Sequence, residues 1–283
     1  MAWVNFHSHT SYCDGIAQPE AYVLQAIELN MPAYGFSGHA PMPYSTNWAI
    51  KQDQLTSYIN EIQRLKEVYT SQIDIYCAVE ADYIPQITGP HLFTNYPFDY
   101  IIGAIHFVGY FADGKPFSVA GKALDFDKGL KEIYGNDIKR LVKAYFSLNC
   151  ELMLEDTPTI LAHADLIKNG FQDSGIQQEK WYQQALFDMI DVAAERDVII
   201  EINTRGLYKQ RTTELYPCEQ ALRYMKQKGV RMMLSADTHL LTELTSGFEY
   251  AVGVLQNNGI NEITVFRKGQ FVEIPFSSTG FDY

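Results

Sequence analysis

The sequence predicts an α/β fold in which parallel strands close into a β/α barrel. Short apolar runs rich in β-branched and aromatic residues alternate with amphipathic helical patterns, and no linker, repeat or low-complexity tract interrupts them. Strands that alternate with helices form parallel sheets with right-handed crossovers. About seven or eight such units in a chain of 283 residues fit a closed barrel better than an open sheet. We therefore expect a single domain over residues 1–283.

The elements follow one another in a regular order. The expected strands are residues 3–7, 33–37, 74–79, 99–106, 159–163, 198–202, 231–235 and 262–266. The expected helices are residues 19–29, 52–70, 127–153 with a break near Gly135, 178–196, 218–228 and 246–258. The first helix has a clear start signal, because Pro19 is followed by apolar residues at Val23 and Ile27 on one face. Residues 107–126 break the alternation, and we expect them to form an insertion loop over one end of the barrel.

Composition narrows the classes of function. Hydrophobic residues make up 47% of the chain, with 19 tyrosines and 16 phenylalanines, which is enough for a large core and argues against disorder. The formal net charge of −12 argues against a protein that binds the phosphate backbone of nucleic acids. A small phosphorylated substrate remains compatible with this charge, because bound divalent cations can reverse the local sign of the potential.

The cysteines and the N-terminal residues indicate a compartment. Cys13, Cys77, Cys150 and Cys218 are scattered without a Cys-x-x-Cys pair, which is typical of reduced thiols in an intracellular protein. The first residues lack the basic and apolar regions of a secretory signal, and no run approaches the ~18 apolar residues of a membrane span. We expect a soluble cytoplasmic protein with no membrane partner. The sequence does not predict an oligomeric state.

Six of the seven histidines lie at or just past the end of an apolar strand-like run. His7 and His9 follow the first run, and side chains two residues apart on a strand point to the same face. The later runs are followed by His39, His106, His163 and His239. His91 lies in a loop and has no such position. Because functional groups of β/α barrels sit at the carboxyl ends of the strands, six imidazoles would meet at one mouth.

Acidic residues occur at the same positions. Glu80 ends the run IYCAVE, Asp237 precedes His239 by two residues, and Asp14 follows His9. Each one alone is compatible with an ordinary hydrogen-bonded residue at a strand end. Together with the imidazoles they would be costly to desolvate without an ion to coordinate. One zinc takes about four ligands, so this set fits two or three ions if a carboxylate bridges them. Such a centre serves metal-assisted hydrolysis.

Seven segments resemble, in order, the motifs of the PHP (polymerase and histidinol phosphatase) superfamily: FHSHTSYCDG, SGHAP, AVEADY, IIGAIH, ILAHADLIK, EINTRG and SADTH. The resemblance spans roughly residues 3–274 and is greatest to the monofunctional histidinol-phosphate phosphatases. It implies a distorted (β/α)7 TIM-like barrel with a trinuclear metal centre. Some members of the family carry a histidine where Asp14 stands, and an acidic residue there is typical of the phosphatase branch. GAIH and SADTH depart slightly from the usual motifs without changing a ligand.

Carried over by motif, the resemblance implies three metal sites. His7 and His9 would bind the first metal with Glu80 and Asp237. Glu80 would bridge to a second metal, held by His106 and His163. Asp14, His39 and His239 would hold the third. The ions would be divalent, and a donor set of imidazole and carboxylate accepts zinc, iron, manganese or cobalt.

The resemblance also implies an activity. The enzyme would hydrolyse a small phosphate monoester, L-histidinol phosphate, to L-histidinol and phosphate in histidine biosynthesis. A metal-bridging hydroxide would attack the phosphorus, and the ions would neutralise the phosphoryl oxygens. Asp237 and His239 are the candidates for protonating the leaving alcohol, although both are also proposed ligands. No cysteine nucleophile is required, since Cys13 is not followed by the arginine of a Cys-x5-Arg phosphate loop.

Substrate-binding residues are expected near the same mouth. Arg205 follows the strand VIIEIN, Arg211 comes six residues later, and either guanidinium would bind phosphate bidentately. Asn203 stands at the same strand end as either a substrate ligand or a capping group. Glu201, two residues earlier, would be a partner of a ligand or a member of a buried salt bridge. Residues 107–126 and the loop PMPYSTNW are candidates for a wall that recognises an imidazole.

Three alternatives remain open. Another phosphoesterase of the same superfamily, acting on a nucleotide, a nucleic acid or phosphotyrosine, would have nearly the same ligands, although the charge of −12 disfavours a nuclease. An amidohydrolase also begins with His-x-His on a first barrel strand and commonly uses a carbamylated lysine or a carboxylate bridge. No strand-end lysine is evident here, and a ligand set with a third site fits the phosphatase better. A metal-binding subunit without turnover would be expected to lack a ligand, and none is missing.

Overall fold

The computed structural model describes residues 2–172 and 174–283. A six-stranded parallel sheet forms its centre, in the order β1-β2-β3-β6-β7-β8. The strands are β1 (Ala33–Phe36), β2 (Asp74–Asp82), β3 (Tyr100–Ala104), β6 (Ile160–Leu161), β7 (Ile199–Asn203) and β8 (Met232–Ser235). Every expected strand from residue 33 to residue 235 is present in this sheet, so that part of the strand prediction is confirmed.

The N-terminal segment closes the sheet into a barrel. Asn5 forms a parallel bridge with Tyr34 of β1, and Ser8 forms another with Thr238, just past β8. The His9 amide donates a hydrogen bond to the Thr238 carbonyl oxygen at 2.8 Å. Seven parallel segments therefore surround the core, as the resemblance implied. The barrel is distorted because the first segment is held by isolated bridges rather than by a continuous ladder.

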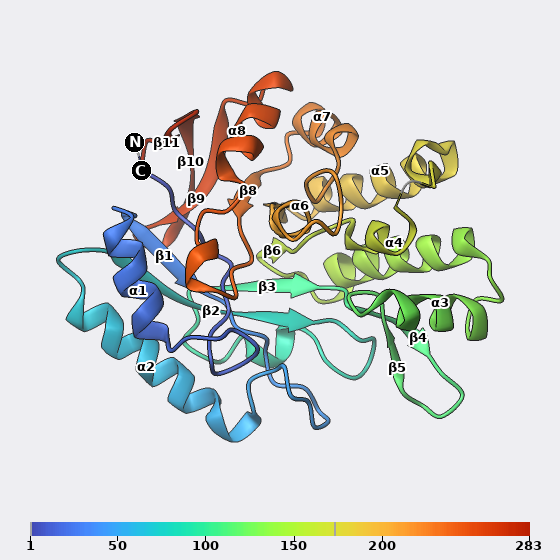
Figure 1. Ribbon diagram of the computed structural model, residues 1–283, viewed down its shortest axis with the longest axis horizontal. Coiled ribbons are helices and arrows are strands. Elements are labelled where there is room, and N and C mark those ends of the chain that lie inside the picture. Colours follow the sequence, from blue (N-terminus) through green and yellow to red (C-terminus); the bar gives the residue numbers. More distant parts are fainter. Residues whose placement is uncertain (1, 173) are drawn as a thin grey trace.

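Helices form the outer layer (Figure 1). They are α1 (Pro19–Glu28), α2 (Leu55–Val68), α3 (Ala123–Glu132), α4 (Ile138–Glu155), α5 (Lys180–Glu195), α6 (Arg205–Tyr208), α7 (Glu219–Lys228) and α8 (Phe248–Asn257). Neighbouring helices pack on one another as α1 on α2, α4 on α5 and α5 on α7. None of the helices within the described residues is long and apolar enough to cross a membrane.

The sequence explains why the helices begin and end where they do. In α2 the buried residues Leu55, Tyr58, Ile62 and Leu65 recur every three or four positions, which gives one apolar face toward β2. The predicted break near Gly135 is confirmed, since α3 ends before this residue and its φ of 63° lies in the left-handed region. The helix α4 then begins after Asp137, whose carboxylate accepts the Arg140 amide at 3.0 Å.

Two segments differ from the expectation. Residues 107–126, which were expected to form an insertion loop, contain a hairpin of β4 (Phe107–Tyr110) and β5 (Pro116–Ser118), followed by the start of α3. The predicted strand 262–266 exists as β9 (Glu262–Arg267) but lies outside the barrel, where it pairs antiparallel with β10 (Gln270–Ser277). The strand β11 (Gly280–Phe281) extends this second sheet, and Ala2 bridges to Phe281, which places the two termini side by side (Figure 1).

Candidate metal centre

The structure brings together all nine residues predicted as metal ligands. They lie at or just beyond the carboxyl ends of the barrel strands: His7 and His9 on the first segment, Asp14 after it, His39 after β1, Glu80 on β2, His106 after β3, His163 after β6, and Asp237 and His239 after β8. The remaining histidine, His91, lies elsewhere on the surface and contacts Asp156 at 2.6 Å. The separation of six histidines from the seventh is therefore confirmed by geometry.

Glu80 occupies the middle of the cluster and is buried. Its Oε1 lies 2.9 Å from His163 Nε2 and 3.7 Å from His106 Nε2. Its Oε2 lies 3.4 Å from His7 Nε2 and 3.6 Å from His9 Nε2. Oε2 also lies 2.9 Å from His39 Nδ1. The two oxygens thus face different sets of imidazoles, which is the arrangement that a bridging carboxylate requires.

The other carboxylates complete the surroundings. Asp237 Oδ1 lies 3.3 Å from His9 Nε2 and 3.9 Å from His7 Nε2. Asp14 Oδ1 lies 3.3 Å from His239 Nε2, and its Oδ2 lies 3.8 Å from His39 Nε2.

Three compact donor groups result. The first is His7, His9 and Glu80, to which Asp237 is adjacent. The second is Glu80, His106 and His163. The third is His9, Asp14, His39 and His239, so His9 belongs to the first group and to this one, and its ring stacks on His239 at a centroid distance of 4.0 Å. In each group the donor atoms lie within 4.8 Å of one another.

Three of the imidazoles have Nδ1 held by an acceptor outside the donor groups. His7 Nδ1 lies 2.5 Å from Glu201 Oε1, and His106 Nδ1 lies 2.8 Å from Asp82 Oδ1. His239 Nδ1 lies 3.0 Å from the backbone carbonyl oxygen of Asp237. An acceptor at Nδ1 fixes the proton there and leaves the lone pair of Nε2 directed into the cluster. This is the tautomer that a metal ligand needs.

Glu201 and Asp82 were not among the predicted site residues. Both are buried, and both act through a histidine that they orient. Asp82 follows Glu80 by two residues on β2, so strand alternation could have placed it on the same face. Glu201 is predicted from the sequence only as a partner of a ligand or a member of a buried salt bridge, and in the structure it contacts Nδ1 of His7, a predicted ligand.

The buried charges are strongly coupled. Burial opposes ionisation of Glu80, but His39 and His7 outweigh it and hold the pKa of this carboxyl well below its usual range. Burial likewise opposes ionisation of Asp237, where His7 and Arg205 keep the pKa well below the ordinary value. Burial, reinforced by His239 and His39, lowers the pKa of His9 to about 3. Burial lowers the pKa of His7 and His106, but Glu201 and Asp82 outweigh it and raise the pKa of His7 well above its usual value and that of His106 to about 9. The carboxylates therefore favour positive charge within the centre, which suits a bound cation.

Two of the predicted ligands have unusual backbone conformations. His163 has a φ of 25° and Asp237 a φ of 50°, although neither is a glycine. Such conformations cost of order 1–3 kcal/mol each and persist where surrounding contacts enforce them. At His163 the enforcing contact is a 2.8 Å hydrogen bond from its amide to Glu201 Oε2. Both side chains lie in the cluster, where His163 contacts Glu80 and Asp237 contacts His9.

Of the predicted substrate-binding residues, Arg205 lies at the edge of the centre. Its Nη1 donates to the Asp237 carbonyl oxygen at 2.7 Å, and its Nε lies 3.9 Å from Asp237 Oδ2. Asn203 is fully buried: its side-chain nitrogen donates to Glu201 at 2.9 Å, and its oxygen accepts the Arg205 amide at 2.8 Å. Asn203 thus caps the turn that presents Arg205.

Arg211 lies apart from this group. It lines a neighbouring cavity of about 430 Å³ together with Lys122 and Asn169. This cavity shares Ala120 and Gly121 with the one over the metal centre, so the two spaces adjoin along the segment after β5.

The turn that carries Arg205 and Arg211 is anchored by an unpredicted buried lysine. Lys168 Nζ donates to Asp165 Oδ2 at 2.9 Å and to the Leu215 carbonyl oxygen at 2.6 Å, and both charged side chains are fully buried. Glu214 accepts a further hydrogen bond from Lys168 at 3.1 Å. These contacts tie the segment after β6 to the segment that leads into α7.

The donor set fits divalent metal ions. His7 Nε2 and His9 Nε2 are buried and have no hydrogen-bond partner among the described residues, although each lies within 3.6 Å of a Glu80 oxygen. A buried imidazole nitrogen without a partner is costly, and a cation between these atoms would satisfy both. Imidazole nitrogen with carboxylate oxygen suits zinc, iron or manganese.

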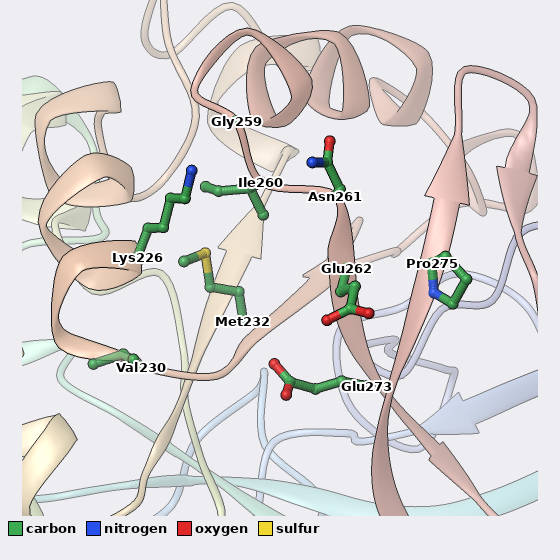
Figure 2. Close-up of a pocket in the computed structure, with 10 residues that line it drawn as sticks. Lys226, Val230, Met232, Gly259, Ile260, Asn261, Glu262, Glu273 and Pro275 are labelled. Carbon is green, nitrogen blue, oxygen red and sulfur yellow. The ribbon is translucent and has the colours of Figure 1, made fainter.

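Another cavity has no comparable chemistry. It measures about 560 Å³ and lies at the amino end of β8, between Lys226 of α7 and Glu273 of β10. Figure 2 shows the carboxylates of Glu262 and Glu273 directed into this space, and no histidine lines it. Catalytic groups of β/α barrels sit at the opposite, carboxyl end of the strands, where the histidines are.

Comparisons with known proteins agree with the geometry. The PHP domain family matches residues 5–205. A "Probable histidinol-phosphatase" of Deinococcus radiodurans is 26% identical over 267 residues, which cover 92% of this chain and 94% of the relative. The "Histidinol-phosphatase" of Bacillus subtilis is 22% identical over 263 residues, covering 86% of this chain and 96% of that protein.

A solved structure shares the fold. The histidinol phosphate phosphatase of Lactococcus lactis, crystallised with zinc, L-histidinol and phosphate, superposes with a TM-score of 0.74 and 17% sequence identity. The match covers 95% of this chain and 98% of that one. At this identity the likeness establishes the distorted barrel fold that the sequence predicted.

Proposed function

The chain belongs to the PHP domain family, and from that premise we propose that it is a metal-dependent phosphomonoesterase that hydrolyses L-histidinol phosphate to L-histidinol and phosphate. The observation that carries the proposal is the convergence of six imidazoles and three carboxylates around Glu80 at one barrel mouth. The substrate is supported by the names of the relatives in Deinococcus and Bacillus. The reaction would belong to histidine biosynthesis in the cytoplasm.

We propose three divalent ions, each held by one donor group. His7, His9 and Asp237 would hold the first with Glu80. Glu80 would extend to the second, together with His106 and His163. Asp14, His39 and His239 would hold the third. When bound, such ions supply an activated water at neutral pH and neutralise the oxygens of a phosphoryl group.

The residues of the chain provide orientation and charge. Glu201 and Asp82 hold the Nδ1 protons of His7 and His106, so that both Nε2 atoms stay available as ligands. Arg205 lies beside Asp237 and would place its free N–H groups on a phosphoryl oxygen. His239 uses Nδ1 toward a carbonyl oxygen, which favours a ligand role for its Nε2 over the role of general acid.

Phosphate release from L-histidinol phosphate by the purified protein tests the proposal, with metal content measured in parallel. p-Nitrophenyl phosphate and a dinucleotide serve as comparators. We expect chelator-sensitive turnover that prefers histidinol phosphate and is lost in His9→Ala. His91→Ala is the matched control, because His91 is exposed and lies outside the cluster. Metal-dependent cleavage of only another ester would refute the substrate while leaving the metal centre intact.

A further inference from the structure

The cavity over the metal centre has an aromatic side. It measures about 260 Å³, and its inner end is formed by Asp14, His39 and His106, which are three of the proposed ligands. Trp48 and Phe107 line the same space. An ester whose phosphorus lies at the metal centre would therefore direct its alcohol part toward these two rings.

The two rings form a continuous wall. Trp48 meets His39 edge to face, at a centroid distance of 5.0 Å and an interplanar angle of 85°. Phe107 lies 6.1 Å from Trp48 at an angle of 36°. Trp48 belongs to the segment after β1 and Phe107 begins β4, just after β3, so the wall spans the end of β2 that carries Glu80.

The charge of the lining selects for one kind of alcohol. Lysine and arginine are absent from the described residues that line this cavity, whereas Asp14 contributes a carboxylate. Aromatic faces stack on other rings and attract cations. A leaving group with an imidazole ring or an ammonium would therefore be stabilised here, and one with a second phosphate or a carboxylate would not. The volume lies below the ~300–1,000 Å³ of sites for drug-sized ligands, which favours a small alcohol.

We propose that Trp48 and Phe107 determine specificity by binding the alcohol part of the phosphate ester, and that they select small alcohols that carry an aromatic or cationic group. The inference rests on the proposed function, because it assumes that the phosphoryl group lies at the metal centre. It adds the residues that distinguish histidinol phosphate from other esters. If Trp48 served only to pack on His39, its loss would affect all esters equally.

The test compares esters that share the phosphoryl group and differ in the alcohol. The kcat/KM values for L-histidinol phosphate, L-leucinol phosphate and ethyl phosphate are measured for wild type, Trp48→Leu and Phe107→Leu. Trp181→Leu is the matched control, since this tryptophan lies on the outer helix α5 beside Cys150, in a different cavity. Metal content is measured for each variant, because Trp48 contacts His39.

We expect Trp48→Leu and Phe107→Leu each to lower kcat/KM for histidinol phosphate about tenfold, the loss expected for one aromatic contact. Ethyl phosphate should change less than about twofold, and Trp181→Leu should change neither substrate. Calorimetric binding of L-histidinol and L-leucinol gives a readout independent of turnover. Trp48→Leu should weaken L-histidinol binding and remove its advantage over L-leucinol.

The outcomes separate the two proposals. Equal losses on histidinol phosphate and ethyl phosphate, or unchanged L-histidinol binding in both variants, would overturn the role of the aromatic wall while the proposed function stands. If Trp48→Leu loses metal, the role of the aromatic wall is judged from the kcat/KM values of Phe107→Leu and from the L-histidinol binding of both variants. If the wild-type enzyme does not prefer histidinol phosphate, the proposed function fails. The preference for binding L-histidinol over L-leucinol then still tests whether Trp48 and Phe107 bind the alcohol.

Discussion

Glu201→Gln tests how the metal ligands are oriented. Glu201 Oε1 accepts hydrogen bonds from His7 Nδ1 at 2.5 Å and from the Ser235 hydroxyl. Oε2 accepts hydrogen bonds from the His163 amide at 2.8 Å and from Asn203 Nδ2 at 2.9 Å. All four partners donate to the carboxylate. A glutamine keeps only one acceptor oxygen, so its NH2 group would face two donors in either orientation.

The cost follows from which oxygen is replaced. With the NH2 group at the position of Oε1, His7 must accept at Nδ1, and its proton moves to Nε2, the atom 3.4 Å from Glu80. A protonated Nε2 cannot bind a metal, and loss of such an outer partner typically costs 10–100-fold in metal affinity, about 1.4–2.7 kcal/mol. With the NH2 group at the position of Oε2, the buried His163 amide loses its acceptor, at about 1–3 kcal/mol of stability.

The assay is metal content after dialysis against graded chelator, with the thermal transition recorded for the same samples. We expect Glu201→Gln to lose metal at a chelator concentration about 10–100-fold lower than wild type. Glu151→Gln is the control, because it removes the same charge from α4, where Glu151 accepts the Tyr83 hydroxyl at 3.0 Å. A Glu201→Gln protein with the wild-type metal complement and chelator resistance would refute the orienting role of this carboxylate.

Three other predictions concern stability and thiol chemistry. Lys168→Met leaves the fully buried Asp165 carboxylate without its charged partner, so the free energy of unfolding measured in urea should fall by about 3–5 kcal/mol. A fall below about 1 kcal/mol would contradict the role of the buried ion pair. Gly206→Ala places a Cβ 2.3 Å from the buried Tyr216 ring and should cost about 1–3 kcal/mol, again by urea unfolding, with wild-type stability as the contrary result. Burial raises the pKa of Cys13, Cys77 and Cys218 to about 12 and that of Cys150 to about 11. Iodoacetamide at pH 7.5 should therefore leave activity intact, and rapid inactivation would contradict this.

The cluster of proposed metal ligands could be predicted because strand ends are visible in the sequence. Each ligand histidine follows an apolar run, and the parallel order of a barrel carries all such ends to one mouth. The bridge between His39 and Glu80 shows how directly this works, since neighbouring strand ends place these residues side by side. Alternation on one strand was sufficient for His7 and His9, and would have been sufficient for Asp82.

Other features depend on contacts between distant segments. Arg205 and Arg211 are six residues apart, but α6 and the antiparallel bridge from Asn203 to Tyr216 turn the chain. Arg205 therefore contacts Asp237, whereas Arg211 lines the adjoining cavity. Lys168 is buried because its acceptors Glu214 and Leu215 come from a segment 46 and 47 residues further on. No local pattern marks a buried lysine, a residue that is ordinarily exposed. The meeting of Trp48 with Phe107 likewise depends on the paths of two loops.

The metal centre and the closure of the barrel depend on the same segment. The first strand joins its neighbours through isolated bridges, reinforced by Asn5, whose side chain donates to the Thr238 hydroxyl at 2.9 Å and accepts the Ala236 amide at 3.2 Å. His7 and His9 lie on this segment, while their carboxylate partners come from β2 and from the chain after β8. Ions held by these groups would tie the first strand to elements on both sides of it. Because ligands that bind only the folded chain add their binding free energy to folding, metal loading would stabilise the barrel where its hydrogen-bonded ladder is weakest.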